Sequence, residues 1–178
     1  MARSKNRGNR QPVAAGVTPE ERDPANWPPE AFDQLQVILD RSRRRAGQAL
    51  RDTFDHPERR MTAREFVSFW NQTRLKAMAT VGVAAVPHVA PVHAELVGGK
   101  LRSTIFVNAV RRSDLQRNPQ VALTTWGVNG ATAIVYGRAR EIPGSERETR
   151  PGASATTRST VALEIELTRI YAMKGRES

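Results

Sequence analysis

The chain has 178 residues, with 28 Lys and Arg against 18 Asp and Glu, and no Cys. This length suffices for one domain with a buried core and additional segments. The lack of Cys excludes disulfides, cysteine nucleophiles and thiolate metal sites, while the net charge of +10 favours anionic partners such as phosphate groups, nucleic acids or membrane surfaces. Because there is no long apolar stretch and no apolar run after the basic N-terminus, we expect no membrane span, no signal peptide and a cytoplasmic location.

The first 29 residues are rich in Arg, Asn, Gly and Pro and show no hydrophobic periodicity. Such a segment cannot bury enough apolar surface to offset its ordering entropy, which predicts a disordered basic arm over residues 1–29. Arg3, Lys5, Arg7 and Arg10 occur there without a nearby acidic residue. Two interpretations remain: a nucleic-acid-binding arm, and a solubilising tail, which the shortness of the run and the lack of aromatic residues favour.

Two helices are predicted before residue 75. In residues 30–56, apolar side chains such as Phe32, Leu35 and Leu39 recur at helical spacings after a Pro-Pro pair, which predicts an N-terminal helix. The segment from Thr62 to Glu65 has the pattern of a capping box, in which the Thr hydroxyl and the Glu carboxylate bond each other's backbone amides. We expect a short second helix to begin there.

From residue 75 the hydrophobic period changes from 3.6 to 2, which predicts strands over residues 75–83, 86–97, 101–108, 120–126, 131–142 and 160–173. Gly98-Gly99 and Asn129-Gly130 are typical of hairpin turns. Residues 111–118 are expected to form a turn or one to two helical turns, and residues 143–159 a loop. The predicted fold is mainly β: a six-stranded antiparallel barrel over residues 62–174, flanked by helices.

Few residues in this barrel have side chains suited to chemistry. His88 and His93 lie five positions apart, so they face opposite sides of a regular strand, and we expect no metal site. The pair Arg111-Arg112 offers planar donors for a phosphate group, and the amides that open a short helix point the same way. An anion site and a solvated basic turn explain this pair equally well.

The order of several motifs is more informative than any one of them. Residues 74–81 read RLKAMATV, residues 86–92 read VPHVAPV, residues 105–108 read IFVN, residues 114–123 read DLQRNPQVAL, and residues 136–139 read YGRA. In this order they resemble the FMN-binding split-barrel family of the pyridoxamine 5'-phosphate oxidase type, including its deazaflavin-dependent branch. The resemblance implies a split β-barrel whose flavin lies between the two subunits of a homodimer.

The resemblance also implies residues for the cofactor site, carried over by motif position. The second strand would contact the flavin ring, the end of the third strand would line the site, the Arg pair would bind the phosphate, and one residue of the fifth strand would approach the ring. These residues are Ala90, Pro91, Val92 and His93, then Val107 and Asn108, then Arg111 and Arg112, and finally Thr132. No catalytic residue is assigned, although His93 is the best-placed candidate for a general acid.

The function implied is an FMN-dependent oxidoreductase that transfers a hydride to or from a small organic substrate. Ala90 stands where the true oxidases have an Arg, and the C-terminal Trp and Arg-Leu signatures of those enzymes are absent, so pyridoxamine phosphate is not the expected substrate. Two alternatives remain open: a reductase that uses the deazaflavin coenzyme F-420, and a non-catalytic module of the same fold that binds haem, a nucleotide or nucleic acid.

Overall fold

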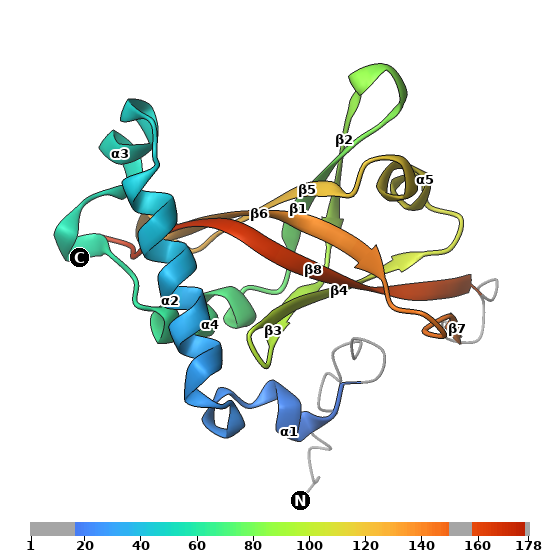
Figure 1. Ribbon diagram of the computed structural model, residues 1–178, viewed down its shortest axis with the longest axis horizontal. Coiled ribbons are helices and arrows are strands. Elements are labelled where there is room, and N and C mark those ends of the chain that lie inside the picture. The colour runs from blue at the N-terminus through green and yellow to red at the C-terminus, as the bar shows by residue number, and fades with distance from the viewer. Residues whose placement is uncertain (1–16, 150–157, 177–178) are drawn as a thin grey trace, which may run out of the picture.

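The computed structural model describes residues 17–149 and 158–176 and contains one curled antiparallel sheet with helices around it (Figure 1). Its strand order is β2-β1-β5-β6-β8-β4-β3, and β7 pairs with β8. The strands are β1 (Lys76–Val81), β2 (Pro87–Val92), β3 (Ala94–Val97), β4 (Lys100–Phe106), β5 (Gln120–Trp126), β6 (Thr132–Glu141), β7 (Arg147–Thr149) and β8 (Arg158–Met173).

The sheet closes on itself through its own backbone. β2 and β3 lie at the two ends of the strand order, yet only His93 separates them in the sequence. They therefore form one bent strand, whose first half pairs with β1 and whose second half pairs with β4. The six-stranded split barrel predicted from the sequence is confirmed, with the predicted strand 86–97 bent at His93.

Alternation along the strands places the core inside the barrel. Met78, Leu101 and Leu123 are almost completely buried, while their sequence neighbours are more exposed. Gly98 and Gly99 form the predicted turn between β3 and β4, and both have positive φ angles, which Gly adopts without strain. The segment 143–159 is not only a loop as expected, because residues 147–149 pair with the start of β8.

The predicted helix after Thr62 is present as α4 (Ala63–Gln72), and both hydrogen bonds of its capping box form. The single helix predicted over residues 30–56 is wrong: α2 (Pro29–Arg44) and α3 (Gln48–Phe54) are separate helices. The chain turns at Ala46-Gly47, and Gly47 caps α3 from an extended conformation. In the described ranges, no helix is both long and apolar enough to cross a membrane.

Part of the segment predicted to be disordered has structure. Residues 17–29 contain the short helices α1 (Pro19–Arg22) and η1 (Pro24–Asn26), and Trp27 is buried against Phe32. A capping box at Thr18 and the Trp27 indole, which donates to the Glu21 carbonyl, hold this segment in place. The disorder prediction is therefore wrong for residues 17–29, and residues 1–16 lie outside the described part of the chain.

The second half of α2 is attached to an irregularity in β8. Between Tyr136 and Gly137 of β6 the register shifts, leaving Thr168 of β8 unopposed. The Arg41 guanidinium donates to the Thr168 carbonyl at 3.3 Å, and the Ser42 hydroxyl accepts from the Ile170 amide at 2.9 Å. Side chains of α2 thus satisfy backbone groups that the bulge removes from the ladder, which fixes the helix across the barrel.

Candidate functional site

The barrel is split between β2 and the end of β4. Residues 100–103 of β4 pair with β3, whereas residues 104–106 pair with β8 alone among the described strands. Ser103 marks the point of divergence, where its hydroxyl donates to the His93 carbonyl at 2.8 Å. Helix α5 (Val110–Arg117) follows β4 after three residues and packs against β1 and β4 (Figure 1). We call the opening bounded by β2, residues 104–109 and the N-terminus of α5 the split.

A buried carboxylate joins α5 to the strands beside the split. Asp114 is 2% exposed and accepts hydrogen bonds from the Thr80 hydroxyl at 2.7 Å and from His88 Nδ1 at 2.8 Å. The bond from His88 is the main cause that holds the pKa of Asp114 below its usual value, and the Thr80 bond acts the same way against the opposing effect of burial. Since Nδ1 is occupied, Nε2 is the ring nitrogen of His88 that remains for another partner.

The two arginines predicted to bind phosphate differ in their surroundings. Arg112 makes two hydrogen bonds to the carboxylate of Glu141, at 2.7 and 3.0 Å, and these bonds raise the pKa of its guanidinium. Arg111 Nε is buried and has no hydrogen-bond partner among the described residues. Arg111 and Asp114 are three positions apart, so they lie on the same face of α5. Of the pair, Arg111 is therefore the one whose guanidinium needs an additional acceptor.

Val107 and Asn108 lie between the end of β4 and the start of α5. The Val107 amide donates to the Ser159 carbonyl at 2.9 Å, while Asn108 is exposed at the edge of the split. Ala109 is the N-cap of α5, and no side chain in the described structure caps the helix there. The first amides of α5 are consequently available to an anion.

Strand β2 places its predicted residues along the other side of the split. Ala90 pairs with Met78, and Pro91 pairs with Ala77. Val92 is buried in the core and pairs with Lys76 of β1, so its side chain does not face a ligand outside the barrel. His93 sits at the bend and its Nδ1 lies 3.1 Å from the Arg74 carbonyl. Because β2 pairs only with β1 among the described strands, its second backbone edge is open to a ligand.

The structure does not bring Thr132 to the other predicted residues. It begins β6 opposite Trp126, and its hydroxyl donates to the Thr125 carbonyl at 3.0 Å. Along the sheet, Thr132 is three strands away from β2. Eight of the nine predicted residues therefore lie around the split or along β2 within one chain, and Thr132 does not.

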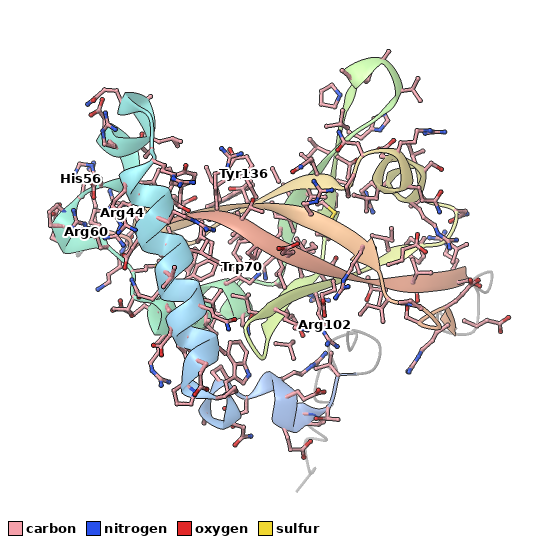
Figure 2. All side chains as sticks on the ribbon, viewed as in Figure 1. Arg44, His56, Arg60, Trp70, Arg102 and Tyr136 are labelled. Carbon is pink, nitrogen blue, oxygen red and sulfur yellow. The ribbon has the colours of Figure 1, made fainter. Side chains whose placement is uncertain are left out.

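The network of Thr80, His88 and Asp114 was not predicted. Asp114 is 34 and 26 positions from its two partners, and alternation in the strands shows only that Thr80 and His88 share a face once the hairpin register is known. Figure 2 shows how the side chains are distributed over the molecule. A hollow of about 960 Å³ lies between α2 and strands β4, β6 and β8, and none of the nine predicted residues lines it.

No family model matches the sequence, and no curated protein is significantly similar to it. Solved structures do match. Conserved hypothetical protein Rv2991 from Mycobacterium tuberculosis has a TM-score of 0.56 and 17% identity, over 68% of this chain and 89% of that chain. General Stress Protein 26 from Bacillus anthracis has a TM-score of 0.51 and 18% identity, over 65% and 97% of the two chains.

An FAD-binding protein from Mesorhizobium loti matches with a TM-score of 0.50 and 17% identity, over 65% of this chain and 96% of that chain. At these identities the matches establish the fold and not the activity. The resemblance seen in the sequence is thus confirmed at the level of the fold: the chain shares the split β-barrel fold of these structures.

Proposed function

We propose that this protein is a flavin-dependent oxidoreductase that binds FMN in the split, with the deazaflavin coenzyme F-420 as the alternative cofactor. The observation that carries the proposal is the buried, unpartnered Nε of Arg111 at the start of α5. A guanidinium in this position and the free amides of a helix N-terminus both favour a phosphate group. The open backbone edge of β2 then offers hydrogen bonds to the polar side of a flat ring.

A bound flavin would supply hydride transfer at its N5 atom. The chain would hold the phosphate through Arg111 and the α5 amides, and would orient the ring along β2 from Ala90 to His93. Arg112 contributes less to the phosphate than the sequence suggests, because Glu141 already neutralises its charge. Its role as a phosphate ligand stays a prediction.

His88 is better placed than His93 to hold a proton beside the split. Its Nδ1 is bound to the buried carboxylate of Asp114, and its side chain is 40% exposed, so Nε2 can exchange a proton with a ligand or with solvent. The carboxylate fixes the orientation of the imidazole ring. His93, in contrast, contacts only a backbone carbonyl.

Replacing Arg111 by alanine is expected to weaken FMN binding about tenfold or more, because a hydrogen bond to a charged group contributes roughly 1.5–3 kcal/mol. Riboflavin lacks the phosphate, so its affinity should not change. Quenching of flavin fluorescence during titration with protein measures both affinities. The same titration with F-420 decides between the two cofactors.

Arg117→Ala is the matched control, since it removes one positive charge from the exposed far end of the same helix. We expect this variant to bind FMN within about twofold of the unchanged protein. An equal loss in Arg111→Ala and Arg117→Ala would show that the phosphate does not contact Arg111. If neither FMN nor F-420 binds, the oxidoreductase proposal fails, and the result favours a non-catalytic module of the same fold.

The proposal includes a homodimer. One outer face of the barrel, here called the β2–β1–β5 face, is formed by side chains that point away from the core and remain uncovered in the single chain. Val89 and Trp126 are each 67% exposed on it, and Leu75 is 53% exposed. Its members are Leu75, Ala77, Ala79, Val81, Val89, Pro91 and Trp126. An apolar face of this kind is typical of a subunit interface.

Val89→Glu should convert a dimer to a monomer, because it would place two like charges in the apolar centre of the interface. Sedimentation velocity measures the change. Val37→Glu is the control: Val37 is 60% exposed on α2, outside this face, and its replacement should leave the sedimentation coefficient unchanged. A monomeric unchanged protein, or a dimer that survives Val89→Glu, would contradict the assignment of the interface.

A further inference from the structure

Four arginines surround a polar hollow at the junction of α2 and α3. The hollow has a volume of about 290 Å³ and is lined by Asp40, Arg43, Arg44, Arg51, Asp55 and Arg60. Figure 2 labels Arg44 and Arg60 at the left of the molecule, close to His56. In Figure 1, α3 and α5 lie on opposite sides of the barrel, so this hollow is separate from the split.

The two carboxylates neutralise only two of the four guanidiniums. Arg43 pairs with Asp40 at 2.9 Å, and Arg60 donates both Nε and Nη2 to one oxygen of Asp55, at 3.1 and 2.7 Å. An excess of two positive charges remains around the hollow. Like charges held this close repel one another, and the arrangement is stabilised when an anion lies among them.

Arg51 and Arg44 carry that excess. The Arg51 guanidinium is held by neutral acceptors, the Ala46 carbonyl at 2.5 Å and the Gln48 side chain at 2.9 Å, so it is ordered without being neutralised. Arg44 makes no hydrogen bond, ion pair or ring contact with any residue that the structure describes. One guanidinium is therefore fixed in place, and the other can close over a ligand.

The site is formed by the break between α2 and α3. If residues 30–56 formed one continuous helix, Arg44 and Arg51 would be separated by two turns along its axis. The turn at Ala46-Gly47 instead folds α3 back, so that Arg51 lines the same hollow as Arg43 and Arg44. The chain then continues through Asp55 to Arg60, which completes the hollow from the other side.

We propose that this hollow binds a small anion that carries two neighbouring phosphate groups. Planar guanidiniums bind phosphate oxygens through paired hydrogen bonds, and four of them can share two phosphates. The volume is about ten times the share of one water molecule in the liquid, which admits a compact ligand. The four guanidiniums gather around one open hollow instead of extending along a basic surface, which would suit a nucleic-acid strand.

Isothermal titration calorimetry of the full-length protein with inorganic pyrophosphate tests this proposal. The titrations use the Arg111→Ala variant, so that anion binding at the split is weakened. We expect saturable binding of one pyrophosphate per chain, and a loss of about tenfold or more in affinity when Arg44 is also replaced by alanine. Orthophosphate, which cannot contact all four arginines, should bind more weakly.

Arg45→Ala is the matched control, because Arg45 adjoins Arg44, is exposed and does not line the hollow. In the same background it should change the affinity by less than about twofold. Equal losses in Arg44→Ala and Arg45→Ala would mean that pyrophosphate responds only to the general charge, and would overturn the proposal. Failure of pyrophosphate to saturate a single site would overturn it as well.

A parallel titration with ADP identifies the source of the two phosphates. If ADP binds more tightly than pyrophosphate and loses affinity in Arg44→Ala, the hollow binds nucleoside diphosphates. If ADP binds equally or less tightly, the free diphosphate is the ligand. Both outcomes support the site, and neither depends on FMN binding at the split.

Discussion

Replacement of Asp114 by alanine is expected to lower the free energy of unfolding by about 3 kcal/mol at neutral pH. The change removes the acceptor of two hydrogen bonds and leaves the hydroxyl of Thr80, which is 1% exposed, without a partner. Urea unfolding followed by circular dichroism measures the loss. Because Asp114 fixes α5 against β1 and β2, FMN affinity should fall as well, as a secondary effect of moving Arg111.

The effect of Asp114 should depend on pH in a defined direction. Its pKa in the folded protein is lower than in the unfolded chain, so its stabilising contribution is present above the unfolded pKa and is lost as pH falls through the folded pKa.

Asp114→Asn keeps an acceptor for Thr80, and its free energy of unfolding should fall by about 1 kcal/mol. Asp52→Ala, at an exposed position, should change stability by no more than about 0.5 kcal/mol. Equal stability of the Asp114→Ala variant and the unchanged protein would show that the network contributes nothing.

Replacement of Lys76 by methionine is expected to stabilise the protein by about 2 kcal/mol at pH 7. Lys76 is 2% exposed inside the barrel, where its ammonium donates to the Thr73 carbonyl and lies 5.3 Å from the centre of the Trp70 ring. Burial lowers its pKa to about 8, against the opposing effect of Glu95. From the ordinary value of 10.5, this shift corresponds to about 3 kcal/mol, of which the lost hydrogen bond removes about 1.

A lysine in a salt bridge usually makes the folded protein less stable as pH rises through its pKa. Buried Lys76 should have the opposite effect. The unfolded chain binds the proton more tightly than the folded protein does, so the unchanged protein gains stability as pH rises from 8 to 10.5. The advantage of Lys76→Met should therefore shrink over this interval in urea unfolding. Lys100→Met, at a side chain that is 58% exposed, should show no such trend. A stability difference that stays constant with pH would refute the buried-charge explanation.

The strands could be predicted from the sequence because alternation and turn residues are local signals. The six segments rich in apolar residues at every second position all became strands, and Gly98-Gly99 turned where expected. The helix break after Arg44 could not be predicted in this way, since Ala46 and Leu50 continue the apolar period across it. In the folded chain, α3 turns back at Gly47 and covers Tyr171 with Phe54.

The site could be predicted only as far as the order of motifs reaches. Val107, Asn108 and Arg111, which that order selects, lie at one opening of the barrel, and their role in binding a cofactor stays a prediction. The order of motifs could not show that Arg112 donates to Glu141, or that His88 binds Asp114, because these partners are 29 and 26 positions apart. Such pairs depend on the register of β6 and on the docking of α5, neither of which has a local signal in the sequence.

The open edge of β2 would ordinarily invite another strand and lead to aggregation. Pro87, Val89 and Pro91 are alternate residues of β2, so their backbone groups point to the same edge of the strand. A proline facing β1 would remove a bond from the ladder, so both prolines direct their nitrogen atoms outward, where they offer no donor. An incoming strand would find carbonyl acceptors with almost no amides between them, and could not pair. The barrel can thus keep one backbone edge accessible to a ligand while remaining protected from polymerisation.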